Sequence, residues 1–126
     1  MYFVLGQHAD IVKSHVNFTH IKGYLDSFDR SKIPANIDWL ICDANISPYD
    51  ALPHLTQLRN KYRHSMKGFF LTAKLGEKLW DSKGDGVYSE VLKLKRLVRA
   101  SMDIKSVNTR QLSTNRQEVF LWAVCS

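Results

Sequence analysis

The chain has few of the residues from which cross-links and metal sites are built. It contains two cysteines in 126 residues, and both Cys42 and Cys125 lie in apolar runs typical of strands. We therefore expect buried thiols of a cytosolic protein rather than a disulfide. The five histidines have no ligand-type spacing and no cysteine neighbours, so no metal site is expected. They are His8, His15, His20, His54 and His64.

Long hydrophobic runs are also missing. No apolar stretch approaches the roughly 20 residues that span a membrane, and the N-terminus lacks the basic start and apolar region of a signal peptide. We therefore expect a cytoplasmic protein without membrane attachment. Hydrophobic residues make up 44% of the chain and charged residues 24%, which is ordinary for a globular protein. A length of 126 residues suits a single domain, residues 1–126, with its own core.

Acidic residues are too few to balance the basic ones, and the formal net charge is +6. The excess is uneven, because residues 64–126 carry eleven Lys and Arg against six Asp and Glu, whereas residues 1–63 carry seven against six. Such asymmetry favours an anionic partner, nucleic acid first. Many globular domains are mildly basic, however, so the charge alone does not decide the partner.

Short apolar runs alternate with helical patterns along the chain. Strands are expected at 2–5, 18–21, 37–42, 68–73, 104–109 and 119–125, and helices at 9–15, 50–63 and 87–101. Asp50 is expected to cap the second helix, with Pro53 in its first turn and Arg59 in a basic end. Only a polar loop, 110–117, joins the last two strands. The pattern therefore predicts an α/β fold with a mostly parallel sheet and a C-terminal antiparallel hairpin.

Three charged residues stand where predicted strands end or begin. Asp43 follows the strand at 37–42, Lys74 follows the strand at 68–73, and Glu118 opens the last strand. Parallel strands would bring all three to one edge of the sheet, where ligands of open α/β sheets bind. A lysine oriented by carboxylates can steer or remove a proton from a ribose hydroxyl. A structural salt bridge at a strand end explains the same spacing equally well.

At these residues the sequence resembles the FtsJ-like ribose 2′-O-methyltransferases, which modify RNA with S-adenosylmethionine. The similar stretches are 38–43 with Pro48, 68–75, 110–112 and 115–119. The resemblance covers residues 37–124 well and 1–36 weakly, and it is strongest to the subgroup that modifies large-subunit ribosomal RNA. It implies a truncated Rossmann-like methyltransferase fold, S-adenosylmethionine as cofactor and RNA as partner.

The resemblance also implies roles for individual residues. Of the family's Lys-Asp-Lys-Glu tetrad, the Asp falls on Asp43, the central Lys on Lys74 and the Glu on Glu118. The central Lys is the family's base for the 2′-hydroxyl, and the other members orient it and the substrate. Asp43 also lies near the reactive end of the methyl donor. The candidate RNA-binding residues are Lys67, Arg110 and Arg116.

The sequence departs from the family at its N-terminal side. The first strand, its glycine-rich loop and the first tetrad lysine have no counterpart, because the chain opens with what resembles the second strand. That strand ends at Gly6-Gln7 without the acid that holds the cofactor ribose, and Lys22-Gly23-Tyr24 stands where the family often has an acid near the adenine. Without the central strand, the strand at 2–5 must pair with the strand at 37–42 or with another chain. We therefore expect a rearranged sheet, a homodimer or a second chain that completes the sheet.

Three functions remain open at this point. The chain is an RNA ribose 2′-O-methyltransferase or its C-terminal part, a non-catalytic methyltransferase-like module that binds RNA or a protein, or a folded remnant without activity. The residues at the sheet edge favour the first function, and the missing cofactor elements favour the other two.

Overall fold

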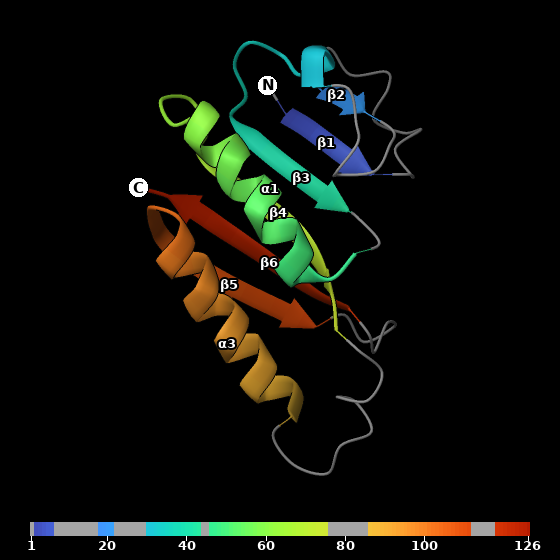
Figure 1. Ribbon diagram of the computed structural model, residues 1–126, viewed down its shortest axis with the longest axis vertical. Coiled ribbons are helices and arrows are strands. Elements are labelled where there is room, and N and C mark those ends of the chain that lie inside the picture. Colours follow the sequence, from blue (N-terminus) through green and yellow to red (C-terminus); the bar gives the residue numbers. More distant parts are fainter. Residues whose placement is uncertain (1, 7–17, 22–29, 44–45, 76–85, 112–117) are drawn as a thin grey trace.

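Six strands form one sheet in a computed structural model, which describes residues 2–6, 18–21, 30–43, 46–75, 86–111 and 118–126. The strands are β1 (Tyr2–Gly6), β2 (Phe18–Ile21), β3 (Trp39–Asp43), β4 (Gly68–Lys74), β5 (Ile104–Gln111) and β6 (Glu118–Cys125). Their order in the sheet is β2-β1-β3-β4-β6-β5 (Figure 1). The pairs β1–β2, β1–β3 and β3–β4 are parallel, whereas β6 runs antiparallel to both β4 and β5. This confirms the predicted fold class, a Rossmann-like α/β sheet that is mostly parallel and ends in an antiparallel hairpin.

The N-terminal strand pairs directly with β3, which is one of the two pairings that the sequence predicts for it. Five residues of β1 are in register with five of β3, from Tyr2 opposite Trp39 to Gly6 opposite Asp43. The rearranged sheet is therefore confirmed. The other predicted arrangement, a homodimer, stays a prediction.

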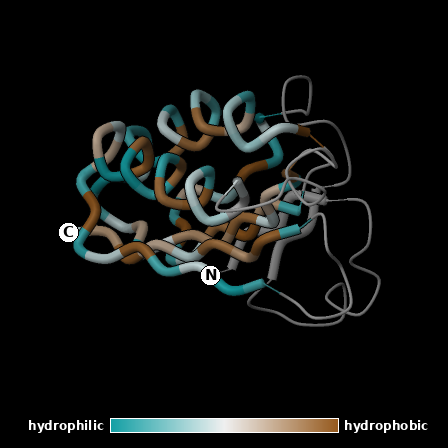
Figure 2. Tube along the Cα trace, turned by 90° about the horizontal axis from the view of Figure 1, so that it is seen from below, coloured by the Kyte–Doolittle hydropathy of each residue, from teal (hydrophilic) through white to brown (hydrophobic). Residues whose placement is uncertain are grey.

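Two helices pack on the same face of the sheet. They are α1 (Pro48–Lys61) and α3 (Gly86–Ser101). Both lie on one side of the strands in Figures 1 and 2, and their hydrophobic residues are turned towards the sheet. A short 3-10 helix, η2 (Arg30–Lys32), precedes β3. The helix expected at 9–15 lies outside the described residues.

The start of α1 differs from the sequence prediction. Ser47, not Asp50, is the N-cap, and its hydroxyl accepts a hydrogen bond from the backbone N–H of Tyr49 at 3.2 Å. Pro48 then takes the first helical position, where its missing N–H leaves no bond unmade. Asp50 lies in the first turn, where a carboxylate interacts favourably with the helix dipole. Pro53 falls inside the helix rather than in its first turn, so the carbonyl of Tyr49 loses its usual helical partner.

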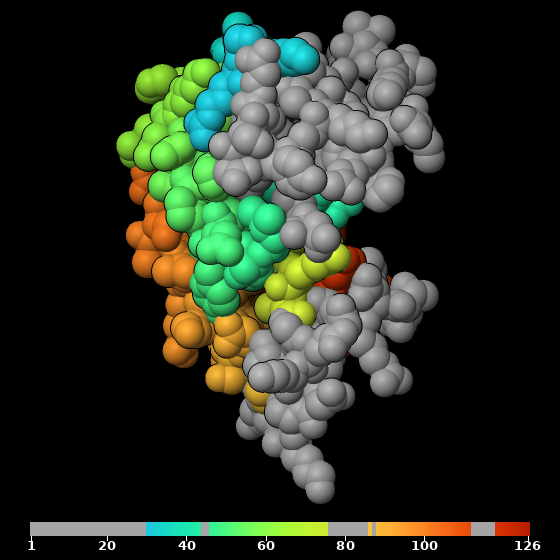
Figure 3. Space-filling view, turned by 45° about the vertical axis from the view of Figure 1, so that its right-hand side comes forward, coloured from blue at the N-terminus to red at the C-terminus, as the bar shows by residue number. Residues whose placement is uncertain are grey.

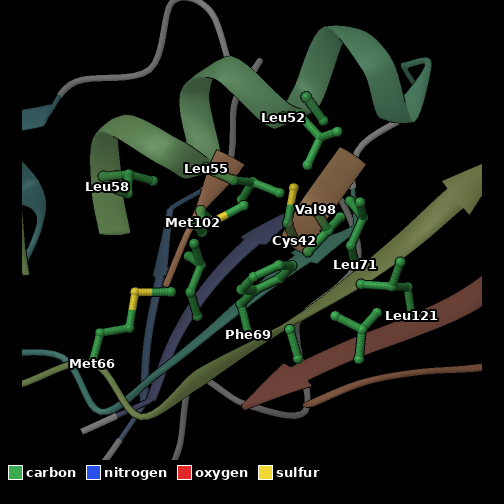
Figure 4. Close-up of a cluster of buried hydrophobic side chains, with 14 of the residues drawn as sticks. Cys42, Leu52, Leu55, Leu58, Met66, Phe69, Leu71, Val98, Met102 and Leu121 are labelled. Atoms are coloured by element: carbon green, nitrogen blue, oxygen red, sulfur yellow. The ribbon is translucent and has the colours of Figure 1, made fainter. Parts of the chain in front are cut away.

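The core lies between the helices and the sheet (Figure 4). Leu52, Leu55 and Leu58 of α1 point down onto Phe69 and the side chains next to it. These residues are all at most 3% exposed. From α3, Leu94 and Val98 are fully buried. The amphipathic spacing of both helices therefore fixes which side of each helix meets the strands.

Arg59 is buried, although the sequence suggests that it belongs to an exposed basic end of α1. Its side chain is 3% exposed, and its guanidinium donates to the backbone carbonyls of Arg63 at 2.9 Å and Ser126 at 3.3 Å. The aliphatic part of a long arginine side chain can cover apolar surface while the charged head finds acceptors. In this chain the acceptors tie the C-terminal end of α1 to the end of β6.

The described residues contain neither a membrane-spanning helix nor a metal-binding cluster. None of their helices is long and apolar enough to cross a membrane. No group of three or more His, Cys, Asp and Glu side chains in the same residues is placed to hold a metal ion.

The packing of α1 on the sheet makes a prediction about stability. Leu55→Ala removes a side chain that is 0% exposed and should lower the free energy of unfolding by about 2–5 kcal/mol. Leu97→Ala makes the same change at a residue that is 39% exposed and should cost about 1 kcal/mol or less. Urea denaturation of both variants measures the difference. Equal losses would show that α1 does not pack as described.

Candidate active site

Charged side chains from strands that are far apart in the sequence lie at the carboxyl edge of the sheet. This is the end at which the parallel strands β1, β3 and β4 finish. Antiparallel pairing places Lys74, the last residue of β4, directly opposite Glu118, the first residue of β6. The Lys74 Nζ lies 3.8 Å from the Glu118 Oε1. In Figure 3 the yellow end of β4 and the red start of β6 lie next to each other. The ion pair therefore follows from the strand register and from the reversal of direction in β6.

Both side chains of this pair are accessible from solvent. The Lys74 side chain is 41% exposed and the Glu118 side chain 22%. An ion pair at such a site contributes about 1 kcal/mol or less to stability. Its main effect is to hold the ammonium group over the end of the sheet, where a ligand can reach it.

Asp43 lies on the same edge and the same sheet face, but it does not join the pair. The last register pair of β3 and β4, Cys42 with Leu71, places Asp43 opposite Thr72. Lys74 is two residues further along its strand, which is about 7 Å. Asp43 is exposed, and the salt bridges of the described residues do not link it to Lys74. The structure thus brings two of the three predicted site residues together and leaves the third close by.

The carboxyl ends of β1 and β3 form a switch point of the sheet. From β1 the chain continues to β2 on one side, and from β3 it continues to β4 on the other side. Ligands of open α/β sheets bind outside the strand ends at such a point. Gly6 and Asp43 are register partners at this position. Asp43 is therefore a ligand-binding candidate on topological grounds, without reference to any family.

The predicted RNA-binding residues are not all found at this edge. Arg110 is exposed near the end of β5, opposite Phe120. Lys67 precedes β4 and so lies at the opposite edge of the sheet, with its Nζ 3.4 Å from the Asp38 carboxylate. Arg116 lies outside the described residues. Of the three residues, only Arg110 is shown at the same edge as Lys74.

A further group of polar side chains near this edge was not expected from the sequence. The Tyr49 hydroxyl, at the start of α1, donates a hydrogen bond to the Glu90 carboxylate at the start of α3. The Lys93 Nζ lies over the Tyr49 ring, 5.5 Å from its centroid. Burial raises the pKa of Tyr49 to about 12, and the Glu90 carboxylate adds to the increase. Glu90 and Lys93 are three residues apart, so they share a helix face, but nothing in the sequence indicates that Tyr49 faces them.

Comparisons with known proteins give a limited result. No model of a known protein family matches the chain, and no curated protein matches it. Among solved structures, it is similar to a METTL16 MTase domain, with a TM-score of 0.46, 13% identity and coverage of 98% of this chain and 50% of that domain. It is also similar to a delta-N METTL16 MTase domain, with a TM-score of 0.44, 10% identity and coverage of 98% of this chain and 62% of that domain. The chain thus spans about half to three fifths of the structures that it matches.

The arrangement at the carboxyl edge suits the handling of a hydroxyl proton. An amine held by a carboxylate can accept a hydrogen bond or a proton once it is uncharged, and its fixed position determines which hydroxyl it reaches. A second carboxylate, Asp43, on the same face can bind a hydroxyl or a positive centre of a ligand. Proton transfer to or from a hydroxyl group is therefore chemistry that these residues can support.

The Tyr49–Glu90 contact makes a prediction about pH. The pKa of Tyr49 is raised from 10.0 to about 12, so its contribution to stability is complete below pH 10 and is lost as the pH rises towards 12. Ultraviolet titration of tyrosinate should show a late-ionising tyrosine in the unmodified chain, and Tyr49→Phe should remove it. Tyr88→Phe, at a residue that is 66% exposed, should leave it in place. A late ionisation that persists in Tyr49→Phe would contradict the contact.

Proposed function

We propose that the chain forms the substrate side of an S-adenosylmethionine-dependent RNA ribose 2′-O-methyltransferase, with ribosomal RNA as substrate. The observation that carries this proposal is the Lys74–Glu118 pair at the carboxyl edge of the sheet. Lys74 is the catalytic residue of the proposal and accepts the proton of the ribose hydroxyl. Glu118 orients Lys74, and Asp43 borders the methyl donor. Arg110 and the positive charge of residues 64–126 support an RNA partner.

The described residues fit the methyl donor only in part. S-adenosylmethionine would supply the methyl group when bound. Asp43 and Gly6 lie at the switch point where a ligand is expected. The direct pairing of β1 with β3, however, occupies the place between these strands where the resembled family has its glycine-rich strand. These residues therefore do not build the whole donor site, and a further chain or segment would have to complete it.

The β1–β3 pairing supports a second candidate function. Because β1 pairs directly with β3, the fold is complete without the methyl donor. A non-catalytic module that binds RNA or a protein would keep the same basic residues. The two candidates differ in donor binding. A stand-alone enzyme requires heat of binding for S-adenosylmethionine in calorimetry at millimolar concentration, and the absence of that heat would rule out catalysis by this chain alone.

Substitution of Lys74 tests the catalytic proposal directly. Lys74→Ala removes the proposed base and should reduce methyl transfer to ribosomal RNA by about 100-fold or more, while donor binding in calorimetry is unchanged. Lys61→Ala is a matched control, because Lys61 is an exposed lysine at the far end of α1. Transfer of a radiolabelled methyl group to RNA gives the rates. Equal rates for the two variants would rule out Lys74 as the base.

A further inference from the structure

The face of the sheet opposite the helices carries a continuous group of aromatic side chains. Side chains alternate between the two faces of a strand, and Phe69, Leu71 and Leu121 point towards the helices (Figure 4). The neighbouring residues therefore lie on the other face. Its aromatic members, called here the aromatic face, are Trp39 of β3, Phe70 of β4, and Phe120 and Trp122 of β6.

The four rings contact one another across three strands. Ring centroids are separated by 5.4 Å for Trp39–Phe70, 5.5 Å for Phe70–Phe120 and 6.1 Å for Phe120–Trp122. The angles between successive ring planes are only 30–42°. The rings thus form one layer of similar orientation over the sheet.

Gly68 provides the space for one end of this layer. A Cβ atom at residue 68 would lie 2.4 Å from the Trp39 ring and 2.4 Å from the Ala123 carbonyl oxygen. The Trp39 ring therefore occupies the place that a side chain at residue 68 would need. The close approach of the ring to the strand requires glycine at this position.

The aromatic face is left partly exposed. All four rings retain some solvent exposure. Both helices that the structure describes lie on the other face (Figure 2). The open face of an antiparallel pair such as β4 and β6 usually carries polar side chains. A partly exposed group of four rings on such a face indicates a binding surface.

The size of this surface favours a small partner over a second copy of the chain. Trp39 lies opposite Gly68 and Phe120 opposite Thr72, so the rings span four residue steps of about 3.3 Å along three strand widths of about 4.8 Å. The footprint is roughly 14 Å by 13 Å, or about 180 Å², against about 800 Å² per partner in a standard protein interface. That footprint suits two or three stacked bases, the number that sheet-surface aromatics of RNA-binding domains accommodate.

The charges and polar groups beside the rings suit the same partner. Arg110 is the register partner of Phe120, and Asn108 is the register partner of Trp122. Both are exposed, so the guanidinium can contact a phosphate while the amide can bind a base edge. Lys74 lies at the end of the same face. We propose that the aromatic face binds single-stranded RNA by stacking bases on Phe120 and its neighbouring rings.

This site goes beyond the proposed methyl transfer, since it does not require the methyl donor. The test uses a fluorescein-labelled oligouridylate of about eight nucleotides and fluorescence anisotropy. Phe120→Leu should raise the dissociation constant by about 5- to 150-fold, the range for loss of one stacked base. Phe120→Tyr keeps the ring and should preserve binding. Tyr88→Leu, which removes an exposed ring from α3, is the matched control and should have no effect.

Thermal unfolding and salt dependence separate the loss of stacking from misfolding and from the loss of charge. Thermal unfolding must show that Phe120→Leu is folded, and Phe70→Leu makes the same comparison if it is not. Arg110→Gln should reduce the slope of log affinity against log salt by about 0.7. Equal affinity of Phe120→Leu and the unmodified chain, or equal binding of duplex RNA, would overturn the proposal. Sedimentation that shows a dimer which Phe120→Leu dissociates would also overturn it in favour of a second copy.

The outcomes separate this proposal from the proposed function. A chain that binds S-adenosylmethionine and methylates RNA, but binds oligouridylate equally well without the Phe120 ring, retains the methyltransferase proposal and loses this one. A chain that requires the ring for RNA binding but binds no donor retains the RNA-stacking proposal and loses the methyltransferase proposal.

Discussion

The structure depends on one constraint, which is the insertion of β6 between β4 and β5 in the antiparallel direction. This strand carries Glu118 at its start, so its direction determines that the carboxylate meets Lys74 at the carboxyl edge and not at the other end of the sheet. The same register brings Phe120 and Trp122 next to Phe70. The ion pair and the aromatic layer are therefore two results of a single strand pairing, and a shift by one residue would turn both to the helix side.

The two faces of the sheet have different roles as a consequence. The helix side is closed and apolar, with Leu55 and Phe69 fully buried, and it supplies the apolar burial on which stability depends. The other face carries rings and charges that remain partly exposed, including Lys74 and Arg110. Residues on this face can change without loss of the core.

Much of this arrangement could be deduced from the sequence, because it depends on hydrophobic periodicity. Apolar residues recur every two residues in strands and every three to four residues in helices. The strands, α3, and the approach of Lys74 to Glu118 all follow from hydrophobic runs and from the polar sequence pattern of residues 110–117. The predicted start of α1 was wrong because Ser47 and Asp50 are both good capping residues, and local sequence does not decide between them. The burial of Arg59 and the contact of Tyr49 with Glu90 depend on groups 67 and 41 residues away in the chain, and no local pattern contains that information.

The crowding around Gly68 has an evolutionary consequence. A side chain at residue 68 and an indole at residue 39 compete for one volume, so the two positions cannot change independently. Homologous chains that gain a Cβ at residue 68 should carry a smaller residue at 39, together with a backbone shift at residue 123, whose carbonyl oxygen lies 2.4 Å from that Cβ position. Covariation of this pair across an alignment would record selection for the ring layer as a unit, in a way that the conservation of either position alone could not.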